Sequence, residues 1–398
     1  MKEPKIRFKG FKGEWVETPL LDVVTLYNGL TYTPNDIRDH GTLVLRSSNV
    51  QEGEISLFDN VYVRSEVATS PNVKKGDIIV VVRNGSRTLI GKHAQIKSDM
   101  PNTVIGAFMA GIHTDEPEFL NALLCTRRFD NEVTINLGAT INQITNGTFH
   151  SMKFLFPDKK EQKALGAYFQ HLDSLIQSTT KKIESLKQVK AASLQSMFPQ
   201  EGETTPRVRF KGFEGEWEKV QFSELYEPSS IKNKTFGADK IISVANMYFK
   251  PVSYISDEEY LKSYNVMNLG DIAFEGNKSK DYAHGRFVEN TIGDGIVSHV
   301  FIVLKPISKQ YDLQFWKYLI NYERIMGPIL LRSTKHSTMM TDLVVSDFLK
   351  ESVLVPSYEE QIEIGKILSS LDRQITLHTQ RLEKLKQIKT ACLDEMFV

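Results

Sequence analysis

The stretch PKIRFKGFKGEW at residues 4–15 recurs as PRVRFKGFEGEW at residues 206–217, with nine of twelve positions identical at an offset of 202 residues. A second stretch, IESLKQVKAASLQSMF at residues 183–198, recurs as LEKLKQIKTACLDEMF at residues 382–397, with nine of sixteen positions identical at an offset of 199. The chain is therefore one unit written twice, with similar ends and divergent middles. We call residues 4–15 and 206–217 the FKG boxes.

The second pair of repeats belongs to two segments that are expected to form long helices. Their heptad seams advance by three and four residues through Leu172, Ile176, Thr179, Ile183, Leu186, Lys190, Ser193 and Met197, and through Leu368, Leu371, Ile375, His378, Leu382, Leu385, Lys389, Cys392 and Met396. The first helix is expected from residue 160 to residue 198, a length of roughly 58 Å. Val189 and Ile388 are expected to fill the space beside the seam lysines.

Helices of this kind can pair with another chain or with each other. The duplication favours pairing within the chain, because an antiparallel pair would bring the end of the first helix to the second middle, where residues 206–217 begin. The end of the second helix would then lie beside residues 4–15. We therefore expect a pseudo-twofold arrangement with one FKG box at the end of each helix.

Both middles are expected to be rich in strands, with equivalent landmarks at Gly76–Asp77 and Gly270–Asp271. Short β-branched runs predict strands at residues 43–45, 78–82, 104–105, 240–244, 271–274 and 297–304. Helices are expected at residues 118–131 and 313–326. The predicted fold class is α+β, a tandem duplicated unit in which two strand-rich domains are joined by two long antiparallel coiled-coil helices.

This organisation predicts four segments. The first strand-rich domain, with its FKG box, takes residues 1–156, and the first long helix takes residues 157–199. A linker and the second strand-rich domain take residues 200–355, and the second long helix takes residues 356–398.

Composition places the chain in the ordinary globular class. It has 398 residues, 41% of them hydrophobic and 25% charged, and its 49 basic and 49 acidic residues balance. No apolar stretch is long enough for a membrane-spanning helix and residues 1–10 lack the apolar core of a signal peptide, so we expect a cytoplasmic protein. Cys125 and Cys392 are too few for a four-ligand zinc site and are expected to be buried thiols.

Motifs for catalysis are missing from the sequence. It contains no phosphate-binding GxxxxGK[ST] loop, no HExxH, no cluster of cysteine and histidine, and no Asn-Pro or Asp-Pro dipeptide of the kind that opens the catalytic loop of amino-methylating DNA methyltransferases. The sequence motif of a metal-dependent nuclease site is matched by Pro157, Asp158, Glu161 and Lys163. These residues open a helix, however, whereas such nucleases carry them on paired strands. We therefore expect no enzyme and no metal site in this chain.

The middles instead offer loops that mix basic, amide and hydroxyl side chains, the groups that contact DNA phosphates and base edges. In the first middle the candidates are Arg46, Ser47, Asn49, Arg83, Asn84, Ser86, Arg87, Lys92, Asn142 and Gln143, the last two from a loop at residues 140–145. In the second they are Asn246, Lys250, Asn277, Lys278, Ser279, Lys280, Tyr282, Arg286, Arg332 and Lys335. Any single loop could simply be solvated, but the two sets hold similar positions relative to Gly76–Asp77 and Gly270–Asp271.

Three features occur in both halves of the chain. They are the FKG box, a divergent middle that ends with Phe149 and Pro157 or with Phe348 and Pro356, and a helix that opens with Glu-Gln and closes with LKQVK or LKQIK. This pattern resembles the specificity subunit of type I restriction-modification enzymes over essentially the whole chain. The resemblance implies that each middle is a target recognition domain for one half of a split, asymmetric sequence in double-stranded DNA.

The resemblance also implies partners. The paired helices would be a spacer on which two methyltransferase subunits dock, with restriction and translocase subunits in the same complex. AdoMet, ATP and Mg²⁺ would then belong to those partner subunits, and this chain would hold no cofactor.

Two alternatives stay open. A freestanding DNA-binding regulator could carry similar loops, although such regulators more often use one reading head per chain and obtain the second by symmetry. A coiled-coil scaffold would need only the helices and would leave the two polar-looped middles without a role.

Overall fold

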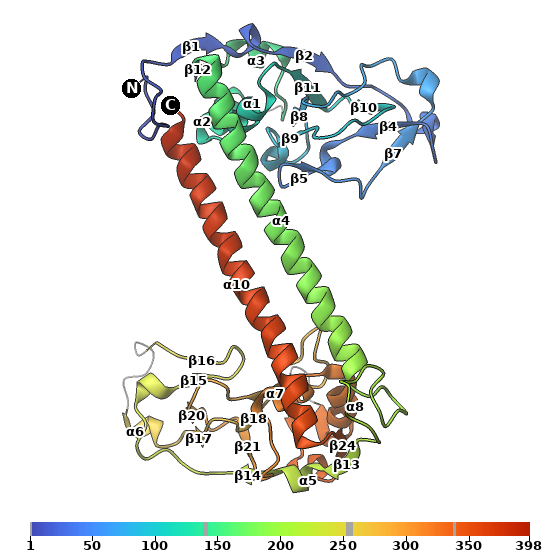
Figure 1. Ribbon diagram of the computed structural model, residues 1–398, viewed down its shortest axis with the longest axis vertical. Coiled ribbons are helices and arrows are strands. Elements are labelled where there is room, and N and C mark those ends of the chain that lie inside the picture. Colours follow the sequence, from blue (N-terminus) through green and yellow to red (C-terminus); the bar gives the residue numbers. More distant parts are fainter. Residues whose placement is uncertain (1, 138–141, 252–257, 337–339) are drawn as a thin grey trace. The chain divides into compact units, whose positions relative to one another are not determined.

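A computed structural model describes residues 2–137, 142–251, 258–336 and 340–398. The chain forms two compact units, which we call the first unit (Met1–Lys181 with Thr379–Val398) and the second unit (Lys182–His378). Figure 1 shows the two long helices, α4 (Lys159–Met197) and α10 (Tyr358–Met396), each of which contributes one part to each unit.

The first unit is built around an antiparallel sheet in the order β2-β11-β8-β9. Its strands are β2 (Thr25–Asn28), β8 (Ile78–Val81), β9 (His93–Gln95) and β11 (Met109–His113). The apolar run of β8 is buried along its whole length. Because successive side chains of a strand point to opposite faces, Ile78 and Val80 enter one core while Ile79 and Val81 enter another.

A second sheet covers the face of Ile79 and Val81. It has the order β10-β4-β7-β3 and consists of β3 (Ile37–Arg38), β4 (Thr42–Leu45), β7 (Val61–Val63) and β10 (Thr103–Ile105). The strands predicted at residues 43–45, 78–82 and 104–105 are therefore confirmed to within one residue at each end.

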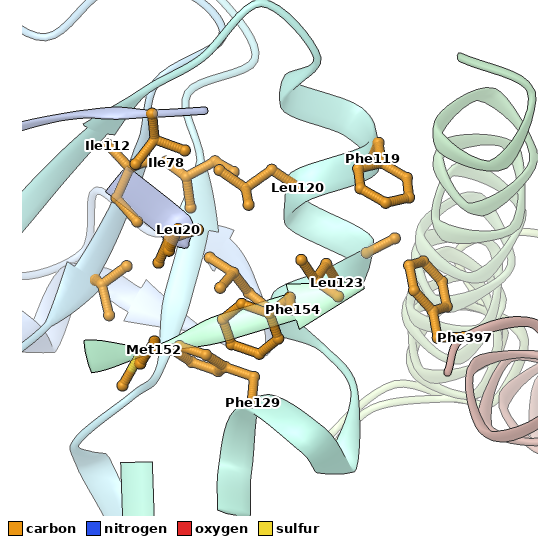
Figure 2. Packing of buried hydrophobic residues seen from close by; sticks show 14 of the residues in the cluster. Leu20, Ile78, Ile112, Phe119, Leu120, Leu123, Phe129, Met152, Phe154 and Phe397 are labelled. Atoms are coloured by element: carbon orange, nitrogen blue, oxygen red, sulfur yellow. The ribbon is translucent and has the colours of Figure 1, made fainter. Parts of the chain in front are cut away.

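Helices cover the opposite face of the central sheet. Figure 2 shows Phe119, Leu120 and Leu123 of α1 (Pro117–Leu124) packed in this core, with Phe397 from the end of α10 facing Phe119. The ring centroids of Phe119 and Phe397 lie 5.6 Å apart.

The helix predicted at residues 118–131 is in fact two helices, α1 and α2 (Arg127–Asn136). Thr126 separates them because it has extended backbone angles and its hydroxyl accepts a hydrogen bond from the Phe129 amide, which caps the second helix.

The second unit repeats the central sheet in the equivalent order β14-β21-β18-β19. Its strands are β14 (Tyr226–Ser229), β18 (Ile272–Glu275), β19 (Arg286–Glu289) and β21 (Ile302–Pro306). Two further pairs are β15 (Ile242–Ser243) with β16 (Tyr248–Phe249) and β17 (Asn265–Met267) with β20 (Gly295–Val297). The main core is closed by α7 (Leu313–Leu319) and α8 (Glu323–Ser333).

Three sequence predictions in this unit are corrected. The run at residues 297–304 is not one strand, because a turn in which the Phe301 amide bonds the Ser298 carbonyl separates β20 from β21. The helix at residues 313–326 breaks where the Tyr322 amide bonds the Leu319 carbonyl. The strand at residues 240–244 shrinks to β15, since Lys240 lies in a 3-10 turn.

The remaining elements are short. They are η1 (Leu20–Asp22), η2 (Pro34–Asp36), η3 (Ser47–Asn49), β5 (Val50–Gln51), β6 (Glu54–Ile55), η4 (Ser65–Val67), η5 (Arg87–Leu89), α3 (Asn146–Ser151), α5 (Phe222–Leu225), η6 (Ala238–Lys240), α6 (Glu258–Leu261), β22 (Thr334–His336), β23 (Thr341–Leu343) and α9 (Val345–Phe348).

Each FKG box is joined to the start of a long helix. Beyond the boxes, β1 (Val16–Pro19) pairs with β12 (Lys153–Phe156), and β13 (Glu218–Gln221) pairs with β24 (Ser352–Val355), directly before α4 and α10. Arg7 donates from Nε and Nη2 to the two carboxylate oxygens of the buried Glu161, both at 2.7 Å, and Arg209 makes the same pair with Glu360. These hydrogen bonds raise the pKa of Arg7 and Arg209.

Each box also receives the end of the other long helix. In the first unit, Phe397 lies edge-on to Trp15 with ring centroids 6.1 Å apart. In the second unit, Phe198 lies edge-on to Trp217 at 6.0 Å. The prediction that each FKG box lies at the end of a helix is confirmed within each unit.

The long helices run antiparallel within both units. In the first unit, Lys389 Nζ lies 2.6 Å from Asp173 Oδ1, and in the second Lys190 Nζ lies 2.6 Å from Asp372 Oδ1. The two pairs are equivalent, because Lys190 and Lys389 are 199 residues apart and so are Asp173 and Asp372. Each seam lysine therefore pairs with the equivalent carboxylate of the facing helix. The predicted antiparallel seam is confirmed, and its members are the less exposed positions along α10.

Two expectations about apolar side chains are wrong. Val189 and Ile388 do not fill space beside the lysines; they are 48% and 38% exposed, because the next position on a helix turns about 100° away from the seam. Cys125 and Cys392 are only partly buried, and their Sγ atoms lie 3.4 Å from His93 Nε2 and 3.3 Å from the Tyr168 hydroxyl.

Candidate nucleic-acid interface

The first predicted loop, at the end of β4, is held by its own polar side chains. Asn49 is fully buried, and its amide donates to the carbonyls of Ser56 at 2.9 Å and Asp59 at 3.3 Å. Arg46 donates from Nη2 to the Asp59 carboxylate at 2.7 Å. Asn49 therefore shapes the loop from inside, while Arg46 and Ser47 remain at its partly exposed surface.

The second predicted loop follows β8 and lies against the first. The Asn84 amide donates to the Ser47 hydroxyl at 3.1 Å, so two of the predicted residues meet directly. Arg83, Ser86 and Arg87 are exposed on the same loop, and Arg87 also donates to the Leu137 carbonyl at 3.3 Å. Lys92 lies exposed just before β9.

A third loop completes the cluster. Gln143 forms an antiparallel bridge with Arg83, and the Asn142 amide donates to the Gly85 carbonyl at 3.1 Å. Residues 140 and 141 of the predicted loop lie outside the described residues. The structure thus brings the loops at 46–49, 83–87 and 142–143 together on one surface.

The second unit joins its loops in an equivalent way. Arg286 donates to the Glu275 carboxylate at 2.8 Å and to the Ala245 carbonyl at 2.8 Å, and its guanidinium lies 5.1 Å from the centre of the Tyr282 ring. These contacts bring the loop that carries the exposed Asn246 to the one that carries Tyr282.

The hairpin of β22 and β23 supplies the third loop. Met340, beside its turn, forms an antiparallel bridge with Asn277. The matching hydrogen bonds, from Ile144 N to Val82 O in the first unit and from Thr341 N to Gly276 O in the second, are both 2.8 Å long. The remaining predicted residues that are exposed around these loops are Lys250, Lys278, Ser279, Lys280 and Lys335.

Arg332 is bonded away from the loops that carry the other predicted residues of the second unit. It donates from Nε and Nη2 to both carboxylate oxygens of Glu351, at 2.9 and 2.6 Å, and this bond raises its pKa. It lies at the open end of the β22–β23 hairpin, whereas Asn277 meets the turn end. Its position favours a role in holding α8 to the segment before β24.

Sequence reasoning missed exposed apolar side chains at this surface, because it searched only for polar residues. Phe108 is 53% exposed beneath the Arg83 guanidinium, which lies 5.1 Å from the ring centre. Leu57 and Phe58 are also exposed, in the loop that Arg46 and Asn49 hold. The sequence signal for Leu57 and Phe58 is an adjacent apolar pair that stands between the polar residues Ser56 and Asp59.

The residues that match a nuclease motif, at positions 157–163, have structural roles at the start of α4. The Asp158 carboxylate accepts hydrogen bonds from the amides of Lys160 and Glu161, which caps α4, and the Glu161 side chain is taken by Arg7. Within the described ranges, no group of three or more metal-ligating side chains occurs. No helix in the described part of the chain is both long and apolar enough to cross a membrane.

Comparison with known proteins gives one consistent result. The family model for the type I restriction modification DNA specificity domain matches residues 12–188 and 214–387. The StySPI specificity subunit of Salmonella potsdam is 24% identical over 94% of this chain and 87% of its own length, and the EcoKI specificity subunit of Escherichia coli K12 is 26% identical over 44% and 39%.

A solved structure shares the fold. The S subunit of a type I restriction-modification system from M. genitalium superposes with a TM-score of 0.65 at 14% identity, covering 100% of this chain and 99% of its own. Because the family model matches both halves of the duplicated chain, this protein belongs to the family of type I restriction-modification DNA specificity subunits, which recognise DNA targets.

Proposed function

We propose that this chain reads a split, asymmetric sequence in double-stranded DNA, with one half-site for each unit. The observation that carries the proposal is that the same three-loop cluster is built twice with different side chains at its surface. Arg83, Asn84 and Ser47 occupy it in the first unit, where Asn277 and Arg286 stand in the second. Arginine and asparagine are the side chains best suited to bidentate contacts with guanine and adenine.

We further propose that two identical methyltransferase subunits dock on the long helices. The exposed residues Lys187–Gln188–Val189 and Lys386–Gln387–Ile388, which we call the KQ patches, repeat at an offset of 199. Their side chains point away from the seam, so packing within the chain does not account for the repetition. An exposed surface that recurs at the same position in both halves of the chain fits two copies of one partner.

The chemistry of the complex would lie in its partners. AdoMet, ATP and Mg²⁺ would be held by the methyltransferase and the restriction and translocase subunits, and this chain would be non-catalytic and cytoplasmic. Residues 1–156 and 200–355 would serve recognition, and residues 157–199 and 356–398 would serve as spacer.

The recognition proposal is tested by co-expressing the chain with its cognate methyltransferase and sequencing the methylated DNA. The expected motif has two different half-sites separated by unspecified bases. A continuous motif would contradict the two-head proposal. A chain that binds DNA but captures no methyltransferase would instead be a freestanding regulator, and one that does neither would be a scaffold.

The docking proposal is tested by charge insertion in the KQ patches. Val189→Glu and Ile388→Glu should each reduce the complex from two methyltransferase subunits to one, measured by native mass spectrometry, and the double variant should capture none. Leu377→Glu is the matched control, because Leu377 is an exposed apolar residue on α10 whose counterpart in α4 is Ser178. Equal loss of capture by the control would contradict the assignment.

A further inference from the structure

The loop between β6 and β7 presents two apolar side chains to solvent. Phe58 is 91% exposed and Leu57 is 52% exposed, although both are large and apolar. Exposed single apolar residues are common, whereas an adjacent exposed pair at a loop tip is a candidate contact for a ligand. We call Leu57 and Phe58 the apolar tip.

The tip is held rigidly from both sides. On the side before the tip, the Ser56 backbone amide donates to the Asn49 carbonyl at 2.8 Å, and the Asn49 side-chain amide donates to the Ser56 carbonyl at 2.9 Å. On the side after the tip, Arg46 Nη2 donates to the Asp59 carbonyl at 3.1 Å and to the Asp59 carboxylate at 2.7 Å. The flanking residues Ser56 and Asp59 are thus held in place, so binding through Phe58 has to order less of the loop backbone than it would in an untethered loop.

The tip also belongs to the proposed DNA surface. Arg46 and Ser47 stand in the same loop as Asn49, and Ser47 bonds Asn84 of the neighbouring loop. The carboxylate of Asp59, which follows Phe58 in sequence, is paired with Arg46, so it opposes a DNA phosphate less than a free carboxylate would.

Sequence argues against a protein partner at this position. The KQ patches, which fit a partner present twice, recur in both halves of the chain. The Leu-Phe pair does not recur: the matching stretch in the second half, residues 250–257, reads KPVSYISD. A group that differs between the halves is expected where the two units read different sequences.

We propose that Leu57 and Phe58 act as a wedge that enters a groove of the DNA and stacks against a base step in the half-site of the first unit. Phenylalanine and leucine are used in this way by proteins that partly unstack DNA. The inference rests on the proposed function and adds a recognition element that hydrogen bonding does not provide. Arg46 and Asn49 are then positioning residues for the wedge.

The test uses the complex with its methyltransferase and a duplex that carries its sequenced target. 2-Aminopurine replaces in turn each adenine in or next to the first half-site, on either strand, and its fluorescence reports unstacking. The wild-type complex should raise the fluorescence at one base step. Phe58→Ala should remove that rise and weaken binding roughly ten- to a hundredfold, while Phe58→Trp should retain both.

The control is Val16→Ala, since Val16 is also an exposed apolar residue of the first unit, at 67%, but lies in β1, outside the loops. It should bind as the wild type does. Wild-type affinity and unchanged fluorescence in Phe58→Ala, together with loss of the half-site in Arg83→Ala, would overturn the wedge and leave the proposed function standing. Loss of methyltransferase capture in Phe58→Ala would overturn the wedge in favour of a protein contact. A wild-type complex that selects no DNA sequence would contradict both the wedge and the proposed function.

Discussion

At the scale of single residues, the two buried ion pairs explain why the FKG box and the Glu-Gln helix start are repeated together. Arg7 and Glu161 are 154 residues apart in sequence, and Arg209 and Glu360 are 151 apart, yet each pair closes the same joint. The glutamine that follows adds a second tie, since Gln162 donates to the Pro157 carbonyl at 2.8 Å. Each repeated motif is therefore one half of a contact.

Removing one partner of such a pair should destabilise one unit strongly. Glu161→Gln should lower the stability of the first unit by about 3 kcal/mol, because Arg7 is left partly buried without its counter-charge. Glu360→Gln should do the same in the second unit. Differential scanning calorimetry is the measurement, and Glu363→Gln, whose partner Lys366 is exposed, should change stability by less than about 0.5 kcal/mol.

A second residue predicts how stability depends on pH. Burial raises the pKa of Glu289 from 4.5 to about 9, against the opposing effects of the Tyr311 hydroxyl and the Lys317 ammonium. Between these values the folded state holds a proton that the unfolded chain has released, so stability falls as the pH rises. The equivalent position in the first unit, opposite Ile78 in β8, is the uncharged Gln95.

Glu289→Gln should therefore stabilise the second unit above pH 5, by up to about 1.4 kcal/mol per pH unit, and should have little effect below pH 4.5. Thermal unfolding at pH 4.5, 6 and 8 checks this. The reciprocal variant Gln95→Glu should bring the same pH dependence into the first unit. A stability difference for Glu289→Gln that does not change with pH would refute the buried proton.

At the scale of elements, the sequence was most informative where a period repeats. The heptad steps predicted the seam of both helices because a helix has one face toward its neighbour, and the β-branched run at residues 78–82 predicted the strand β8. That β8 is buried on both faces is a finding of the structure. The split of the helix at 118–131 was not predictable from period, since buried residues such as Leu120, Leu123 and Phe129 continue across it at helical spacing and one hydroxyl, that of Thr126, caps the second helix. The prediction for Val189 and Ile388 is wrong because Lys190 and Lys389 occupy their own seam positions, where they pair with Asp372 and Asp173.

In the candidate site, too, the position of the loops was predictable from the sequence but the orientation of individual side chains was not. Residue type and position relative to Gly76–Asp77 selected loops that do converge, but which side chains face outward depended on local bonds. Asn49 is turned inward by Ser56, and Arg332 is held by Glu351. Such contacts join residues that are remote from any pattern, and the apolar tip was missed because exposure of Phe58 is decided by the loops around it.

The interhelical lysines give a prediction at this scale. Lys190→Glu should place two carboxylates together and weaken the helix pair by about 1 kcal/mol, a modest cost because both groups are partly exposed. Adding Asp372→Lys should restore the pair with reversed sign. Calorimetry of the single and double variants measures the coupling. A double variant no more stable than Lys190→Glu would show that the ion pair does not join the helices.

At the scale of the whole molecule, the duplication makes the two units interchangeable in plan and different in detail. The central sheets have the same order, the boxes make the same ion pairs, and the loops meet through equivalent bridges. What differs is the set of side chains on the loops. We therefore propose that the shared parts serve assembly and that the divergent loops determine which DNA sequence is read.

The most direct test of this claim is a chain whose second middle is replaced by its first. Residues 16–151 would be inserted in place of residues 218–350, between the second FKG box and β24, with both long helices unchanged. Methyltransferase capture and a cooperative unfolding transition would serve as controls for folding. Sequencing of the methylated DNA should then show the half-site of the first unit twice and the original second half-site not at all. A folded, active chimera that still methylates the original asymmetric target would contradict the account.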